Sequence, residues 1–141
     1  MKKFLKRALV VLLVVMVGIQ FVPTNRDNPP VASEITASGP VKAVLERCCY
    51  DCHSNETSWP WYSHVAPFSW LIEDHVEVGR KQLNFSTWGS LTRKQQKKMM
   101  EEILEEAGEG EMPPWDYTLL HGDAAPTEGD VNVLRKWVEG G

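Results

Sequence analysis

Cysteine is scarce in this sequence of 141 residues. It has three, Cys48, Cys49 and Cys52, and all of them lie within five positions. Because the count is odd and none of the three has a distant partner, a disulfide framework is excluded as the basis of the fold. Cysteines clustered beside a histidine point instead to the chemistry of a cofactor or a metal.

Strand-like alternation of apolar and polar residues and internal repeats are also missing. From Pro40 onward the apolar residues recur at helical spacing, as Val41, Val44, Leu45 and Cys48 do. The length suits one domain and is too short for two ordinary ones. The sequence therefore predicts a small all-α domain of about four helices.

The helices are expected over residues 40–48, 67–83, 92–108 and 127–138. Thr92 with Gln95 forms a capping box at the start of the third helix, and Thr127 with Asp130 marks the start of the last. The buried stripe of the second helix is expected to hold Phe68, Leu71, Ile72, Val76, Gly79 and Leu83.

A surplus of positive charge is absent as well. The chain carries a net charge of −4, and its four amino-terminal cations mask an acidic remainder, so residues 8–141 alone carry −8. This balance argues against nucleic acid as a partner. It is compatible with a redox protein partner that has a basic docking surface. Acidity that only keeps the domain soluble is the alternative, and composition leaves both open.

The amino terminus is basic and then apolar. Four cations lie within residues 2–7, an apolar run follows from Ala8 to Val22, and Pro23 ends it. A basic flank that stays cytoplasmic and an apolar run that enters the bilayer are typical of an export signal. No small-residue cleavage site follows at the usual distance, which favours an uncleaved signal anchor over a signal peptide for residues 1–23. Either form places the domain in the periplasm or elsewhere outside the cytoplasm, at the inner membrane if the anchor is retained.

Residues 24–39 are polar and rich in Pro, Asn and Ser, without helical spacing. This composition predicts a flexible tether between the membrane and a folded domain over residues 40–141.

The segment Cys49-Tyr50-Asp51-Cys52-His53 carries the clearest chemistry. Two thiols three positions apart on a helical turn can both reach the vinyl groups on one edge of a porphyrin. The next residue then directs an imidazole nitrogen at the iron from the same side, and this spacing is the signature of c-type haem attachment. The sequence therefore predicts haem c, with Cys49 and Cys52 as covalent sites and His53 as the proximal axial ligand of the iron. Cys48 extends the apolar stripe of the first helix and is expected to be buried.

Three other interpretations of the motif stay open. A thioredoxin-like dithiol uses the same cysteine spacing but belongs on a βαβ framework. A zinc site needs two further ligands, and His64 and His75 lie outside the usual interval for a histidine pair. A chance pentapeptide with inert, buried thiols is the third.

Met112 is the leading candidate for the sixth ligand of the iron. It lies in Gly110-Glu111-Met112-Pro113-Pro114, where two prolines hold the chain extended and clear of the neighbouring helices. Ligation by methionine and histidine raises the reduction potential and suits electron transfer. The alternatives are His75, which otherwise is a satisfied core histidine, the loop residues His64 and His121, and an open site. Met99 and Met100 fall mid-helix and are expected in the core.

Tryptophan is abundant, with six residues in this short chain. The number suggests that the fold encloses a large flat group, although a Trp-rich core without a ligand is the alternative.

Residues from about 45 to 138 resemble the small bacterial haem-binding domain family that has a Cys-x-x-Cys-His motif and is related to cytochromes c. The matching segments are residues 52–62, 66–71, 75–80, 83–88 and 112–114, together with a late Trp137. The resemblance implies a cytochrome c-like fold, thioether bonds at Cys49 and Cys52, His53 as proximal ligand and Met112 as distal ligand.

The expected function is electron transfer by a membrane-tethered carrier rather than catalysis. The rival is a haem enzyme or a gas or redox sensor with an open or displaceable sixth ligand, although no distal acid–base pair is evident in the sequence. A haem module within a larger complex is a third possibility. A further hypothesis lets Arg80 or Trp88 donate a hydrogen bond to a haem propionate while Asn84 caps the second helix; local capping and surface salt bridges are the alternative.

Overall fold

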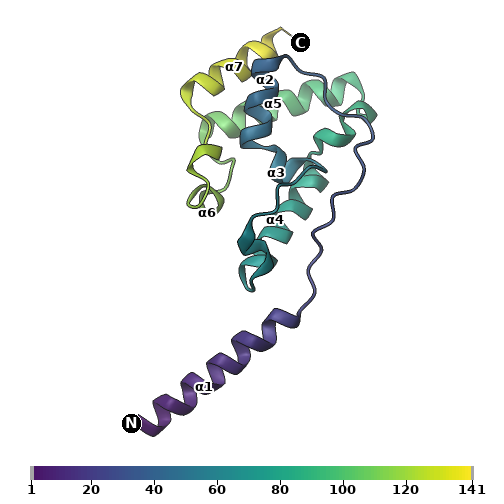
Figure 1. Ribbon diagram of the computed structural model, residues 1–141. Helices are drawn as coiled ribbons and strands as arrows, with labels where there is room; N and C mark the ends of the chain where they lie inside the picture. Colours follow the sequence, from purple (N-terminus) through teal and green to yellow (C-terminus); the bar gives the residue numbers. More distant parts are fainter. Residues whose placement is uncertain (1, 141) are drawn as a thin grey trace.

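The computed structural model describes residues 2–140, and within them the chain is helical and has no strand (Figure 1). The α-helices are α1 (Lys2–Gly18), α2 (Gly39–Cys48), α3 (Tyr50–His53), α4 (Phe68–Gln82), α5 (Arg93–Glu109), α6 (Trp115–Thr118) and α7 (Glu128–Glu139). Four short 3-10 helices join them: η1 (Ile19–Phe21), η2 (Trp61–His64), η3 (Phe85–Ser90) and η4 (Gly122–Ala124). The predicted all-α class is confirmed.

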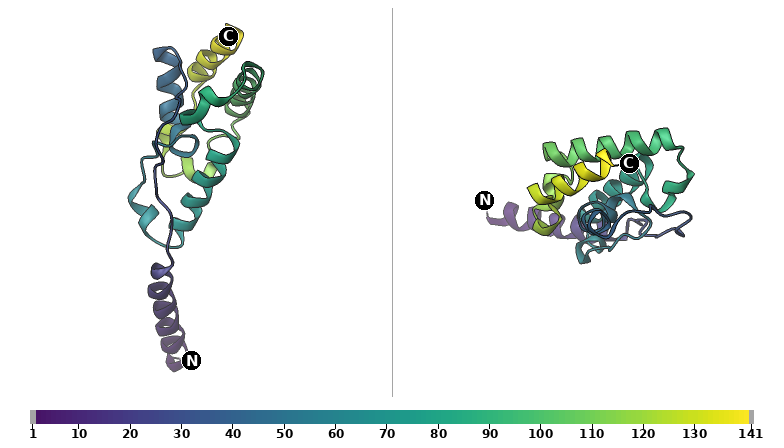
Figure 2. Two further views of the ribbon diagram at one scale, coloured as in Figure 1. Left: turned by 90° about the vertical axis from the view of Figure 1, so that its right-hand side faces the viewer. Right: turned by 90° about the horizontal axis from the view of Figure 1, so that it is seen from above.

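Helix α1 projects away from the rest of the molecule (Figures 1 and 2). None of its residues is buried, and Lys2–Phe21 form a 20-residue apolar stretch with a mean hydropathy of 2.1. At 1.5 Å per residue such a stretch covers about 30 Å, the thickness of a bilayer's hydrocarbon core. The helix is thus apolar and long enough to cross a membrane or to act as a signal sequence.

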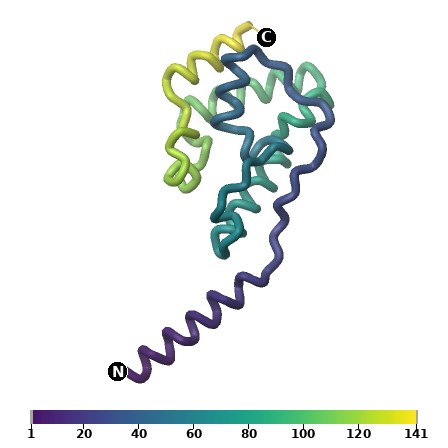
Figure 3. Tube along the Cα trace, in the orientation of Figure 1, coloured from purple at the N-terminus to yellow at the C-terminus, as the bar shows by residue number. Residues whose placement is uncertain are grey.

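Residues 24–38 form no helix, as expected, and they run along the domain (Figure 3). The backbone N–H groups of Ala32 and Ser33 donate to the carbonyl of Ser86 at 3.0 and 2.9 Å, and that of Ile35 donates to Phe85 at 3.0 Å. The Ile35 side chain is buried in the main core. Residues 24–38 therefore form an extended strap along the domain, where composition alone suggests a flexible tether.

The expected long helices are all present, and their ends follow the predicted caps. Thr92 and Gln95 form a complete capping box at the start of α5, and Thr127 and Asp130 form one at the start of α7. Helix α5 continues one residue past the predicted stop at Gly108 and ends at Glu109. Its capping residue, Gly110, adopts the left-handed conformation with φ of 77°. This backbone region favours glycine, which explains why the helix stops there.

Two apolar cores organise the domain. The main core joins α2, η3, α5 and α7 through Leu45, Phe85, Ile103 and Leu134, and Cys48 is buried in it as predicted. Met99 and Met100 pack against its edge, also as predicted. The second core joins η2, α4, α6 and η4 through Tyr62, Ile72, Val76, Tyr117 and Ala124.

One part of the predicted stripe on α4 is wrong. Phe68 and Leu71 are exposed, whereas Ser69, Ile72, Val76 and Gly79 are the buried residues of the helix. The predicted helical period is correct, but α4 packs mainly on α3 and η2, and these elements leave Phe68 and Leu71 exposed. Gly79 lies at the contact with α3, where a Cβ atom would come within 2.5 Å of the Cys52 carbonyl oxygen. Only glycine allows α3 and α4 to approach this closely.

Candidate functional site

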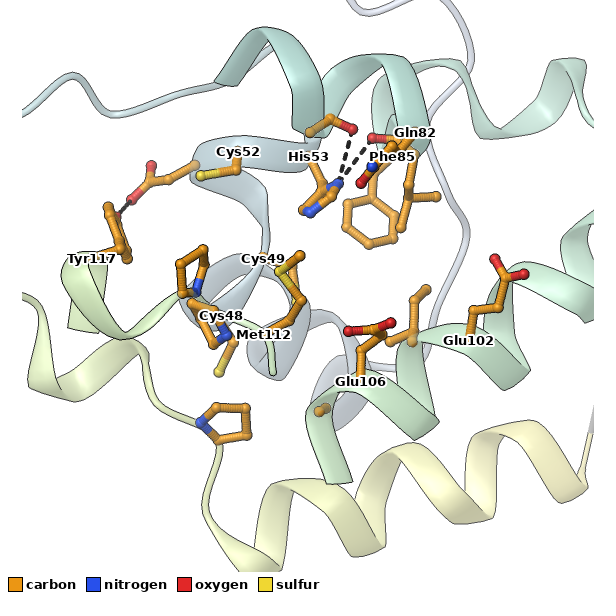
Figure 4. Close-up of a pocket in the computed structure, with 18 of the residues that line it drawn as sticks. Cys48, Cys49, Cys52, His53, Gln82, Phe85, Glu102, Glu106, Met112 and Tyr117 are labelled. Atoms are coloured by element: carbon orange, nitrogen blue, oxygen red, sulfur yellow. Dashed lines mark hydrogen bonds between the residues drawn. The ribbon is translucent and has the colours of Figure 1, made fainter. Parts of the chain in front are cut away.

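A cavity of about 710 Å³ lies between α2, α3, α4, α5 and the loop from residue 110 to 114 (Figure 4). Its volume is within the range of about 300–1,000 Å³ that is usual for cofactor and ligand sites. Core residues such as Val44, Phe85, Ile103 and Leu134 supply apolar walls. Within the described chain, none of the six tryptophans lines this cavity, so the expectation that they enclose a flat group is wrong.

Cys49, Cys52 and His53 all line the cavity. Cys49 lies between α2 and α3, where its non-helical backbone changes the direction of the chain. The single turn of α3 then carries Cys52 and His53. Burial raises the pKa of both thiols to about 12, and the neighbouring Asp51 adds to the effect on Cys52. Both sulfur atoms are free and, because of these high pKa values, protonated at neutral pH.

The imidazole of His53 is fixed by two backbone carbonyl groups of the α4 end. Its Nδ1 atom lies 3.0 Å from the Gly79 oxygen and 3.2 Å from the Leu83 oxygen. Because a carbonyl oxygen only accepts, we assign the proton to Nδ1, which leaves Nε2 with a free lone pair. Burial lowers the pKa of His53, so the ring is neutral at neutral pH. A neutral imidazole whose other N–H is bonded to a carbonyl is the form that binds metals.

Met112 reaches the same cavity from the loop between α5 and α6 (Figure 4). Its backbone N–H donates to the Glu106 carbonyl at 3.3 Å, which ties the loop to the last turns of α5. Met99 of α5 also lines the cavity. The structure thus brings the predicted residues Cys49, Cys52, His53 and Met112 together.

His75 differs from the satisfied core histidine that its place on α4 suggests. It lines the cavity, its Nε2 lies 3.6 Å from Asp116 of α6, and among the described residues its buried Nδ1 atom has no hydrogen-bond partner. Of the two histidines expected to be solvated, His64 is exposed, but His121 stacks on Tyr117 at 4.3 Å and bonds the Tyr62 hydroxyl at 3.2 Å.

A contact that the sequence does not reveal joins the cysteine turn to the methionine loop. The Tyr117 hydroxyl of α6 donates to the Asp51 carboxylate at 2.7 Å. Asp51 lies between the two cavity cysteines, and Tyr117 follows Met112 by five residues. Burial and the bond to Asp51 raise the pKa of Tyr117, so it stays a donor at all ordinary pH values. No pairing of Asp51 with Tyr117 is visible in the sequence, because it depends on how α6 folds back.

Arg80 and Trp88 make contacts away from the cavity, and neither lines it within residues 2–140. The Arg80 guanidinium donates to the Ser54 and Asp27 carbonyls and to the side chains of Asn28 and Thr57, which fastens the strap. Trp88 is buried against Phe85 and Trp137.

Asn84 also acts differently from the hypothesis, because its side chain caps η3 by accepting from the Ser86 N–H and does not cap α4. The alternative of local capping and packing is the one that the structure describes for Arg80, Trp88 and Asn84.

Carboxylates crowd one rim of the cavity, where α5 contributes Glu102, Glu105, Glu106 and Glu109. Within residues 2–140, no group of three or more His, Cys, Asp or Glu side chains is arranged to hold a bare metal ion. The zinc interpretation of the motif therefore has no ligand set there. The dithiol interpretation called for a βαβ framework, whereas the described chain is helical.

The described domain is all-helical and has a large, mainly apolar cavity. Two neutral thiols and an imidazole bonded to carbonyl groups line this cavity, and these features suit a protein that binds an organic metal cofactor. The family model described as haem-binding domain matches residues 14–140, and the chain belongs to this family. Haem is thus the cofactor class that the family assigns. Comparison with curated proteins and with solved structures returned no match.

The residues of the cavity fit a haem. The Nε2 atom of His53 has a lone pair and no competing proton, and the free thiols are neutral. The orphaned Nδ1 atom of His75 is a polar group that a bound molecule can satisfy.

We predict that Tyr117→Phe lowers the free energy of unfolding by about 1.5–3 kcal/mol, because the lost hydrogen bond has a charged acceptor. Tyr62→Phe is the matched control, since its hydroxyl contacts the imidazole of His121 and the expected loss is about 0.5–1.5 kcal/mol. Urea unfolding of both variants at pH 7 makes the comparison. A smaller loss for Tyr117→Phe than for Tyr62→Phe would show that the bond to Asp51 contributes little.

Proposed function

We propose that this domain binds one haem c covalently and transfers electrons at the outer face of the cytoplasmic membrane. The observation that carries the proposal is the shared cavity of Cys49, Cys52 and His53, in which the imidazole is already fixed with Nε2 unprotonated. When bound, haem supplies an iron centre that takes up and gives back one electron. The chain's own residues hold the group, orient it and limit what reaches the iron.

Cys49 and Cys52 are proposed as the attachment residues. Each thiol would add across one vinyl group, with its sulfur atom bonding one carbon and its hydrogen going to the other, so that no oxidant or reductant would be needed. The raised pKa of both thiols supports this role indirectly, because protonated, buried thiols resist stray oxidation before attachment. Cys48 also borders the cavity, but it is buried in the main core, and we propose no part for it in the attachment.

His53 is proposed as the proximal ligand of the iron. The carbonyl groups of Gly79 and Leu83 hold its ring orientation and its tautomer. Hydrogen bonds from the Nδ1 proton to carbonyl groups also make the Nε2 atom of the ring more basic.

Met112 is proposed as the distal ligand. Its loop is held at both sides, by the bond of its own N–H to Glu106 and by the bond of Tyr117 to Asp51. A thioether on a fixed loop closes the sixth position, which suits electron transfer and raises the potential. The glutamates on the α5 rim act in the opposite direction, because negative charge favours the oxidised form.

A second candidate function is a haem enzyme or a gas or redox sensor, and His75 is the specific observation that favours it. His75 lines the cavity, and its Nε2 atom lies 3.6 Å from the Asp116 carboxylate, so the two side chains form an acid–base pair that is not evident in the sequence.

The proposed location rests on α1, whose basic start predicts a signal anchor with the domain in the periplasm. The acidic charge of residues 8–141 supports a redox protein partner with a basic docking surface.

Covalent attachment is tested by extraction with acidified organic solvent. We expect the haem of the wild type to stay with the denatured protein and that of the double variant Cys49→Ala/Cys52→Ala to be extracted completely. Cys48→Ala is the matched control and should retain its haem, because this thiol lies in the main core. Release of haem from the denatured wild type would contradict the proposal.

The role of Met112 is tested by carbon monoxide binding and redox titration. We expect the reduced wild type to bind carbon monoxide weakly, Met112→Ala to bind it tightly, and the midpoint potential of this variant to fall. His75→Ala is the control and should leave both quantities close to those of the wild type. Tight binding by the wild type, or an unchanged potential in Met112→Ala, would favour the enzyme or sensor.

A further inference from the structure

Large apolar side chains are exposed at one end of the domain. They belong to η2, the start of α4, and α6 with the turn after it, and we call them the apolar end: Trp61, Phe68, Trp115, Leu119 and Leu120. Trp61 and Trp115 are 78% and 79% exposed. Three of the other four tryptophans, Trp59, Trp88 and Trp137, are at least partly buried, so this exposure is not general.

The apolar end is continuous although its residues come from two parts of the chain. The ring of Trp61 contacts Tyr62 at 5.8 Å, and Tyr62 contacts Phe68 at 6.5 Å. Tyr62 in turn bonds His121, which stacks on Tyr117 of α6. This aromatic bridge holds η2 and α6 side by side beneath the exposed residues.

Haem in the cavity would not cover the apolar end. None of its five residues is among those that line the cavity in the described chain. Soluble monomeric proteins rarely expose contiguous apolar patches of this kind, and such patches mark contacts with proteins or membranes.

The end of the apolar amino-terminal helix is attached to the same part of the domain. The Gln20 side chain donates to the Ala66 carbonyl at 3.1 Å and accepts from the Ala66 N–H at 3.0 Å. Arg26 donates to the Ser63 carbonyl at 3.1 Å. Figures 1 and 2 show α1 leaving the domain at the end that carries η2. A bilayer that contains α1 therefore has its headgroup layer next to the apolar end.

The chemistry of the apolar end suits a lipid surface. Tryptophan is enriched at the boundary between headgroups and acyl chains, because its ring is apolar and its N–H is polar. Phenylalanine and leucine beside it are the side chains that interfacial segments bury in lipid. Because the domain is acidic, attraction to anionic headgroups does not contribute, and burial of apolar area is the driving force.

We propose that the apolar end inserts into the headgroup boundary of the bilayer that holds α1. The domain then lies on the membrane in one orientation, with the strap bound along it, and the direction in which the cavity opens is fixed relative to the bilayer. This inference rests on the anchoring of α1 that the proposed function includes, and it adds a second membrane contact.

The experiment uses the full-length, haem-loaded protein, labelled with 5-fluorotryptophan and placed in phosphatidylcholine nanodiscs. Single Trp→Phe variants assign the fluorine signals. Lipids with a nitroxide near the headgroup are then added to the nanodiscs. We expect the signals of Trp61 and Trp115 to relax several times faster than without the nitroxide, whereas buried Trp88 and partly buried Trp137 serve as internal controls and stay unchanged.

The outcomes separate the two proposals. If the protein does not co-purify with the nanodiscs, α1 does not anchor it in the bilayer. This result would overturn both the anchoring and the docking. Protein that co-purifies, but whose Trp61 and Trp115 signals relax no faster than that of Trp88, keeps the anchor and overturns the docking; a protein partner then becomes the occupant of the apolar end. As a second variant, Leu119→Ser/Leu120→Ser should reduce the effect at Trp115 and leave the haem absorption spectrum unchanged.

Discussion

The pair of hydrogen bonds that hold His53 is the interaction on which the site depends. Both acceptors, the Gly79 and Leu83 carbonyls, belong to the last turn of α4 and the residue that ends it. These carbonyls come within reach of the imidazole only because α3 packs tightly on α4, and Gly79 allows that approach. Cys52 lies at the same contact and lines the cavity, so one close helix pair arranges the proposed ligand and one proposed attachment residue together.

The rest of the molecule builds the cavity around this pair. The main core fixes α2 and α5 as walls, and the bond of Tyr117 to Asp51 returns the Met112 loop to the cysteine turn. Asp51 lies inside the cysteine motif and Tyr117 lies in α6, so a displacement of the Met112 loop also displaces the cysteine turn. The two sides of the cavity are therefore joined by the part-buried hydrogen bond from Tyr117 to Asp51, while the strap and Arg80 secure the outer surface.

Local patterns in the sequence were sufficient for the helices and for the motif. The capping boxes at Thr92 and Thr127 fixed two helix starts, because such caps involve only neighbouring residues. Contacts between distant segments could not be predicted in this way. The strap, the bridge from Tyr117 to Asp51 and the exposure of Phe68 depend on how helices pack, and an apolar residue at helical spacing does not say whether another element covers it. The tryptophans show the same limit, since their number suggested a cofactor wall and two of them lie most exposed at the apolar end.

Nitrogen-15 NMR of histidine in the reduced, haem-loaded protein tests most directly whether His53 is the anchored ligand. An unperturbed imidazole titrates near a pKa of about 6.5. Because burial lowers the pKa of His53 and its Nδ1 proton is bonded to two carbonyls, we expect His53 to keep its proton on Nδ1 and not to titrate at the unperturbed value. A His53 signal that titrates with the unperturbed pKa of an imidazole would contradict this expectation, since the imidazole would then be neither anchored by α4 nor bound to iron.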